Sequence, residues 1–157
     1  MGVTCFRELG SVAALGRNVD IVRSGFDHFA ATGDMLADIV APEFVWDMSH
    51  TAWPEEQTYD GIEGARTFLR RWTGSWDDWE FELESLHDAG DQVVAITRQS
   101  GRSKATGLRV GLTMAMVWTL RDGKETRMEM YADPAEAMRA VGLQDPSSAR
   151  GSSSGPP

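Results

Sequence analysis

The sequence is poor in several residue types, and their scarcity excludes whole classes of protein. Its 157 residues contain one cysteine, Cys5, so no disulfide can form within the chain, which fits a reducing compartment. Only two lysines are present, Lys104 and Lys124, and a formal charge of −9 leaves no basic stripe for a nucleic-acid backbone. No apolar run approaches the ~18 residues of a membrane span, and the N-terminus shows no basic-then-apolar signal sequence. We therefore expect a cytoplasmic protein that binds neither nucleic acid nor membrane.

Motifs for metals and phosphate-bearing cofactors are also missing. The three histidines, His28, His50 and His87, lack the spacing of metal ligands, so we expect no metal site. Residues 61–64 have the wrong glycine spacing for a phosphate loop or a dinucleotide fingerprint, and no serine nucleophile motif occurs. The chemistry that remains is cofactor-independent.

The strongest pattern is a strand, a tight turn and a second strand. From residue 108 to 120 every second side chain is large and apolar, ending in Met114, Met116, Trp118 and Leu120, which is the period of a pleated strand. Asp122-Gly123 then predicts a hairpin turn, because both residues tolerate positive φ. Residues 125–132 alternate again, with Met128 and Met130 on one side. This Met-rich face is either part of the core or the wall of a pocket for apolar ligands.

The rest of the chain predicts helices and further strands. Apolar side chains at three- and four-residue steps predict helices at residues 19–33, 35–40, 62–72 and 135–141. Alternation predicts strands at residues 44–48, 79–86 and 92–101. Asn18 is expected to cap the first helix, and Asp34 is expected to cap the second. Pro42 must end the second helix. Residues 49–60 are expected to form a loop at a cavity mouth, and three glutamates on strand 79–86 to protect an edge.

The order of these elements predicts a single α+β domain at residues 18–143. Residues 1–17 are interpreted as an arm or short helix, and the Ser-, Gly- and Pro-rich residues 144–157 as a disordered tail.

Several segments in this order resemble one known superfamily. They are Gly33-Asp34, residues 44–47, residues 59–64, Asp122-Gly123-Lys124 and residues 131–137. Their order and spacing are similar to those of the nuclear transport factor 2-like superfamily, which includes ketosteroid isomerase and the SnoaL-like polyketide cyclases. The resemblance implies a curved antiparallel sheet wrapped by N-terminal helices into a cone, an apolar pocket inside the cone, and a homodimer.

The resemblance also suggests catalytic candidates. Asp47 falls close to the general base of ketosteroid isomerase, and its neighbour Trp46 favours a raised pKa. Arg98, His50 and Tyr131 are candidates for stabilising an oxyanion. The alternatives are an Asp47 satisfied by loop amides, an Arg98 in an ion pair with Asp47 or Glu129, and a solvated His50.

The same analysis predicts a set of ligand-contacting side chains. They are Phe26, Trp46, Tyr59, Trp72, Met114, Met116, Trp118 and Met128. Phe26 occupies the place of the tyrosine that supplies an oxyanion hydrogen bond in ketosteroid isomerase.

Three hypotheses for function follow. The first is a cofactor-independent isomerase, aldol cyclase or dehydratase acting on a hydrophobic polycyclic or polyketide-like carbonyl compound. The second is a non-catalytic module that binds a small molecule or dimerises. The third is epoxide hydrolysis, because Arg98 resembles the strand arginine of limonene epoxide hydrolases. The two aspartates that complete the site in those enzymes are matched here by Ser100 and Met130.

Overall fold

The computed structural model of the chain describes residues 16–55 and 57–143. The elements, in chain order, are α1 (Arg17–Thr32), the 3-10 helix η2 (Ala37–Ile39), β1 (Val40–His50), β2 (Thr58–Asp60), α2 (Gly61–Gly74), β3 (Trp76–Ala89), β4 (Gln92–Ser103), β5 (Arg109–Arg121), β6 (Lys124–Tyr131) and α3 (Pro134–Ala140). The predicted tail, and all but the last two residues of the predicted arm, lie outside the described residues. None of the described helices has the length and apolar character needed to cross a membrane.

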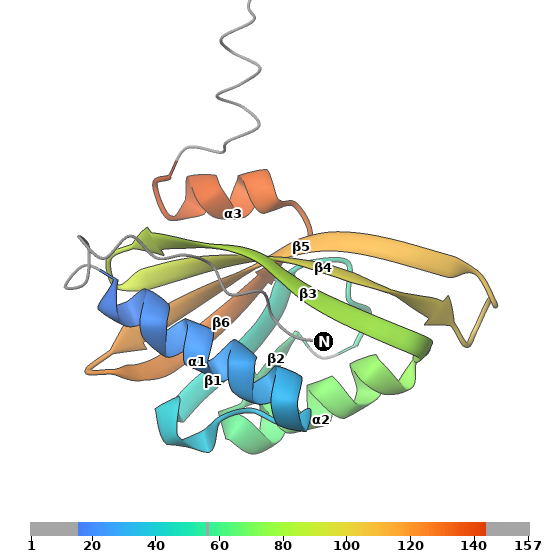
Figure 1. Cartoon of the computed structure of the whole chain (residues 1–157), viewed down its shortest axis with the longest axis horizontal. Coiled ribbons are helices and arrows are strands. Elements are labelled where there is room, and N and C mark those ends of the chain that lie inside the picture. Colours follow the sequence, from blue (N-terminus) through green and yellow to red (C-terminus); the bar gives the residue numbers. More distant parts are fainter. Residues whose placement is uncertain (1–15, 56, 144–157) are drawn as a thin grey trace, which may run out of the picture.

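The strands form one six-stranded sheet in the order β2-β1-β6-β5-β4-β3. Neighbouring strands are antiparallel except β1 and β6, which are parallel, so the expected antiparallel sheet has one exception. Helices α1 and α2 cover one face of the sheet and α3 lies on the other (Figure 1). The expected α+β class with N-terminal helices is confirmed.

Two apolar clusters match the two covered faces. The larger lies under α1 and α2 and contains Val22, Phe26 and Phe68 together with Met116 and Trp118 of the sheet. The smaller lies under α3 and is built from Val94, Ala115, Val117, Tyr131, Ala137 and Met138. Alternate residues of β4 and β5 therefore enter different clusters, as the two-residue period requires.

The predicted hairpin is confirmed. Asp122 and Gly123 form the turn with φ of 53° and 80°, and Met116 pairs with Met130 across the two strands. One irregularity interrupts the pairing: Thr119 lies opposite Arg127, whereas Leu120 lies opposite Glu125. Thr126 is therefore an extra residue, a β-bulge, and a bulge turns the side chain beside it to the other face. Glu125 consequently shares the inner face with Leu120 rather than the outer face with Arg127.

Helix α1 begins two residues earlier than expected and without a side-chain cap. Its N-cap is Gly16, and Asn18 lies inside the helix, so the predicted capping role of Asn18 is wrong. The Asn18 amide instead donates to the carbonyl of Gly90 at 2.9 Å, which links α1 to the turn between β3 and β4. The helix ends as predicted at Gly33, which has a φ of 78°.

The segment after α1 differs most from the prediction. The expected helix at residues 35–40 is only the short η2, and β1 already begins at Val40 and runs through Pro42. Proline is tolerated there because β1 and β6 have no paired residues between Val40 and Val45. The Asp34 carboxylate accepts from the Met35 N–H and pairs with Arg66 instead of capping a helix.

The remaining elements follow the predictions closely. The expected loop at residues 49–60 contains the short strand β2, which pairs with β1. Helices α2 and α3 cover the predicted ranges, and Asp133 caps α3 by accepting from the Ala135 N–H at 3.0 Å. The edge strand β3 exposes Glu80, Glu82 and Glu84, as its alternation predicts.

Candidate active site

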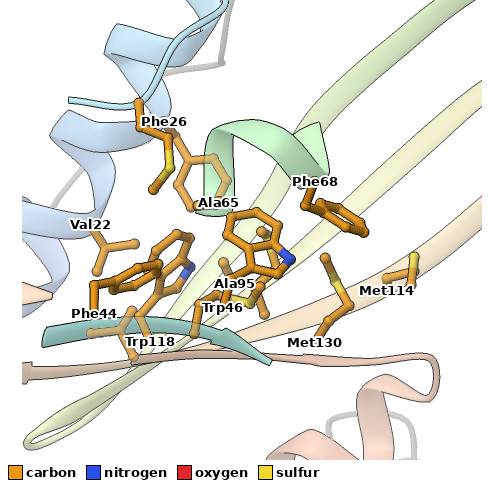
Figure 2. Close-up of a cluster of buried hydrophobic side chains, with 14 of the residues drawn as sticks. Val22, Phe26, Phe44, Trp46, Ala65, Phe68, Ala95, Met114, Trp118 and Met130 are labelled. Atoms are coloured by element: carbon orange, nitrogen blue, oxygen red, sulfur yellow. The ribbon is translucent and has the colours of Figure 1, made fainter. Parts of the chain in front are cut away.

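A cavity lies between the inner face of the sheet and helices α1 and α2. It has a volume of about 70 Å³ and is open to solvent at its mouth. Phe26 of α1 lies against Trp118 of β5 with ring centroids 6.0 Å apart, and Phe68 of α2 lies against Trp46 of β1 at 5.2 Å (Figure 2). Pockets for small organic ligands have volumes of roughly 300–1,000 Å³. The cavity is therefore smaller than such pockets, and a small apolar ligand fits only if it extends into the open mouth or displaces lining side chains.

The lining is almost entirely apolar. Six of the eight predicted contact residues line it, namely Phe26, Trp46, Trp72, Met114, Met116 and Trp118. The other two predicted contact residues are not among those that line the cavity. Met128 is fully buried in the core beside the cavity, and the hydroxyl of Tyr59 is buried under Trp53, whose Nε1 donates to it at 3.0 Å.

The cavity contains one ionisable side chain among the described residues, Glu125. It is 3 % exposed and makes no hydrogen bond or ion pair with any described residue. Its carboxylate lies over Gly25 of α1, where a Cβ atom would stand 3.7 Å from Oε2. Burial raises the pKa of Glu125 from 4.5 to about 8, because the charged form loses its hydration without gaining a partner. At pH 7 about nine-tenths of the molecules therefore carry the neutral acid.

A second polar side chain, Gln99, lines the cavity. It is 4 % exposed, and its Oε1 accepts a hydrogen bond from the indole Nε1 of Trp72 at 2.9 Å. Because this bond occupies the amide oxygen, the amide NH2 has no hydrogen-bond partner among residues 16–55 and 57–143 and is available to donate.

Two lining tryptophans also carry unused donors. The indole N–H groups of Trp79 and Trp118 are buried and have no hydrogen-bond partner within the described part of the chain. Buried donors without partners are uncommon in folded proteins.

Asp47, the predicted general base, is not part of this cavity. It lies on the outer face of β1, where it accepts from the Ser49 N–H at 2.8 Å and pairs with Arg127. Burial alone would raise the pKa of Asp47, but the hydrogen bonds from Ser49 and the charge of Arg127 outweigh burial and lower it. The expectation of a raised pKa is wrong, and the alternative of a carboxylate satisfied by loop amides describes the observed geometry.

His50 and Tyr131 also lie on the outer face of the sheet. Their rings stack at 4.2 Å with an angle of 4° between the planes, and His50 Nε2 is 3.3 Å from Glu129 Oε1. Arg127 Nε lies 3.5 Å from the other Glu129 oxygen, which joins this pair to Asp47. Burial and then the charge of Glu129 raise the pKa of Tyr131. Three of the four predicted catalytic residues are thus brought together, but on the face opposite the cavity.

Arg98, the fourth candidate, lies neither in the cavity nor with Asp47, His50 and Tyr131 on the outer face. Its side chain is 60 % exposed and pairs with Glu84 of the edge strand β3. The inner residues of β4 are Val93, Ala95 and Gln99, so Arg98 points outward by alternation. Arg98 does form a structural ion pair, although with a different partner from the two considered above.

Glu125 and Gln99 are the polar residues that sequence reasoning missed. Strict alternation from Met128 and Met130 assigns Glu125 to the outer face, and only the bulge at Thr126 reverses that assignment. Gln99 shares a face of β4 with Val93 and Ala95 by alternation, but both faces of β4 are apolar in sequence, so its inward direction had no local signal. Within residues 16–55 and 57–143, no group of three or more His, Cys, Asp or Glu side chains is arranged to hold a metal ion.

The fold and the apolar cavity define the class of the protein, a domain of the nuclear transport factor 2-like and ketosteroid isomerase-like fold. The model of the SnoaL-like domain family matches residues 22–128, more than half of the chain. The chain therefore belongs to the SnoaL-like domain family. No curated protein matches it in sequence.

Solved structures with the same fold include three that illustrate its range. A candidate SnoaL-like polyketide cyclase from Jannaschia sp. CCS1 is 22% identical, with a TM-score of 0.63, over 89% of this chain and 100% of that chain. A nuclear transport factor 2-like protein from Burkholderia thailandensis E264 is 29% identical, with a TM-score of 0.58, over 81% and 95%. TerC, crystallised with polyporic acid, is 20% identical, with a TM-score of 0.60, over 80% and 98%.

Proposed function

We propose that the protein is a cofactor-independent proton-transfer enzyme that acts on a hydrophobic polycyclic or polyketide-like carbonyl compound. The observation that carries this proposal is Glu125, a carboxyl group in an apolar cavity without a partner among the described residues, whose pKa of about 8 lies near neutral pH. A catalytic acid or base works best when its pKa lies close to the operating pH.

One carboxyl group is sufficient for the reactions considered. The carboxylate form of Glu125 takes a proton from the carbon next to a carbonyl, which leaves an enolate and a neutral carboxyl. That carboxyl then returns the proton to another carbon in isomerisation, to the new alkoxide in aldol cyclisation, or to the departing hydroxyl in dehydration. Each sequence restores the carboxylate and consumes no other reagent.

The surroundings of Glu125 favour this chemistry. Its apolar neighbours exclude water, and electrostatic interactions with a developing enolate are stronger in such an environment. The charged form is costly there, so an ionised Glu125 is a stronger base than an exposed glutamate. Among structures of the same fold, two candidate polyketide cyclases and a protein crystallised with polyporic acid support the proposed class of substrate.

The test is exchange of the α-proton of carbonyl compounds in heavy water. A panel of polycyclic and polyketide-like ketones is incubated with the wild type and with Glu125→Gln, and deuterium incorporation is followed by mass spectrometry. We expect Glu125→Gln to lose 10²-fold or more of the exchange rate, on the order of a general-base contribution, with ligand affinity retained. The wild-type rate should rise with pH as Glu125 ionises and level off above about pH 8.

Asp47→Asn is the control, because it removes a carboxylate on the opposite face of the sheet. Equal exchange rates in the wild type and Glu125→Gln would overturn the proposal. So would loss of exchange in Asp47→Asn in a variant that remains folded.

A second candidate function is a non-catalytic module that holds an apolar small molecule. The nearly unbroken apolar lining of the cavity favours it, since such a surface binds without any proton transfer. Binding of panel members with no exchange at any pH between 6 and 9 would support this function over the first. Epoxide hydrolysis is not proposed, because Arg98 points away from the cavity and pairs with Glu84.

A further inference from the structure

We infer that the cavity binds a small organic cation, an alkylammonium ion whose charge pairs with Glu125 and whose carbon atoms lie against aromatic rings. This role goes beyond the proposed reaction, because it needs no carbonyl group on the ligand and no transfer of a proton to carbon.

The charge that the cavity offers has one sign. Glu125 is the only acidic side chain in the lining among the described residues, and no lysine, arginine or histidine of residues 16–55 and 57–143 lines it. Lys124, the neighbour of Glu125 in sequence, is exposed, and its Nζ donates to the carbonyl of Asp38 at 2.7 Å. A buried carboxylate is costly unless a cation pairs with it, and here a ligand can supply that cation.

The Glu125 carboxylate borders the cavity directly. Its Oε2 lies 3.7 Å from the place that a Cβ atom on Gly25 would take, and glycine leaves that place empty. The side chain is 3 % exposed and makes no hydrogen bond with any residue that the structure describes. Its acceptor positions are therefore available to the N–H groups of an ammonium ion.

Two aromatic rings lie on either side of this position. Phe26 directly follows Gly25 on α1, and its ring meets that of Trp118 edge-on, with centroids 6.0 Å apart. Trp118 lies two residues before Leu120, the partner of Glu125 on β5, so it is a diagonal neighbour of Glu125 on the same face of the sheet. Aromatic rings attract an ammonium group within about 6 Å of the ring centroid, so these rings add to the attraction of the carboxylate.

The size of the cavity restricts the ligand. A water molecule takes up about 30 Å³ in the liquid, so a volume of about 70 Å³ has room for roughly two water molecules. An ethylammonium ion, with three non-hydrogen atoms, is of this size. The formal charge of −9 on the chain also favours the approach of a cation over that of an anion.

Ethylammonium and ethanol test the inference, because they have the same number of non-hydrogen atoms and differ in charge. Binding at constant ionic strength is followed by the fluorescence of the tryptophans that line the cavity. At pH 9 we expect ethylammonium to bind about tenfold more tightly than ethanol, with a dissociation constant on the order of millimolar for so small a ligand. Between pH 9 and pH 7 its affinity should fall about tenfold, because the ionised fraction of Glu125 falls by that factor. The affinity for ethanol should not fall.

Three variants make the result specific. Glu125→Gln keeps the size of the side chain and should abolish the preference for ethylammonium. Glu82→Gln is the matched control, since it makes the same substitution at an exposed position on β3, and it should keep the preference. Phe26→Leu keeps an apolar side chain but removes the ring, and it should weaken ethylammonium about fivefold relative to ethanol, which tests the site even if Glu125→Gln does not fold.

Equal binding of the two compounds at pH 9, no binding of ethylammonium, or a preference that persists in Glu125→Gln would overturn the inference. These outcomes are distinguishable from failure of the proposed function, because exchange of ketone protons is measured without any amine. Loss of exchange in Glu125→Gln beside equal binding of ethylammonium and ethanol refutes only the cation site. A preference for ethylammonium that depends on Glu125, with exchange unchanged in Glu125→Gln, refutes only the reaction.

Discussion

The ionisation of Glu125 predicts how the stability of the protein changes with pH. Its pKa of about 8 in the folded protein lies above its ordinary value of 4.5, so the folded state keeps this proton over a range in which the unfolded chain has lost it. Stability therefore falls as the pH rises from 4.5 to about 8. Each unit of pKa difference corresponds to about 1.4 kcal/mol, so the full effect is on the order of 5 kcal/mol.

Glu125→Gln removes the ionisation while keeping the size of the side chain. We expect the free energy of unfolding of the variant, relative to the wild type, to increase by about 3 to 4 kcal/mol between pH 5 and pH 8. The sign follows from the cavity: above neutral pH the wild type must bury a charge that has no partner in the described part of the chain, whereas the amide stays neutral at every pH.

Urea denaturation followed by tryptophan fluorescence measures this difference at intervals across the pH range. Glu82→Gln is the matched control, since it removes the same charge from an exposed position on β3. The difference in the free energy of unfolding between Glu82→Gln and the wild type should stay nearly constant across the pH range. This control separates the effect of burying Glu125 from the effect of the net charge of −9. Parallel stability curves for the wild type and Glu125→Gln would refute the reasoning, because they would mean that Glu125 ionises normally in the folded protein.

Three further predictions concern other parts of the chain. Asp47→Asn should lower the free energy of unfolding by about 1–3 kcal/mol at pH 7, because the wild-type carboxylate pairs with Arg127. This difference between variant and wild type should narrow as the pH falls below 3.8, because the carboxylate, whose pKa is lowered in the folded protein, then also becomes protonated. Urea denaturation at pH 7 and in this acidic range checks this. Gly33→Ala should destabilise the protein by about 1 kcal/mol, because the φ of Gly33 is 78°. Gly74→Ala changes a helical position with open space around it and should be neutral or stabilising by up to ~1 kcal/mol. Equal effects of the two substitutions in thermal unfolding would contradict the argument. Gly25→Ala places a methyl group 3.1 Å from Ile39 Cδ1 and beside the Glu125 carboxylate, so we expect weaker binding of 1-alkanols in fluorescence titrations with little loss of stability.

Alternation and helical periodicity are local properties, and they predicted the elements that depend on local order. The hairpin of β5 and β6, helices α1, α2 and α3, and the strands β3 and β4 all follow from them. Alternation along residues 44–48 also places Asp47 on the side of β1 opposite Trp46, where it lies in the structure. What failed was the expectation of a raised pKa for Asp47, because the hydrogen bonds from Ser49 and the charge of Arg127, which lies 80 residues away in sequence, outweigh burial.

The segment after α1 was less predictable for a related reason. Residues 35–40 have helical spacing, but pairing of β1 with the distant β6 draws Val40 into the sheet and leaves only η2. Tertiary pairing of this kind overrides a weak local preference.

The sequence by itself determined which side chains share a face of each strand, since neighbouring residues of an extended chain must point in opposite directions. It did not determine which face borders the hollow, because β4 is apolar on both sides and the answer depends on where α1, α2 and α3 pack. Nor did it determine the direction of Glu125, because the extra residue at Thr126 is set by pairing between two strands and has no signal in either one. The acid that makes this cavity chemically interesting was therefore placed by tertiary structure alone.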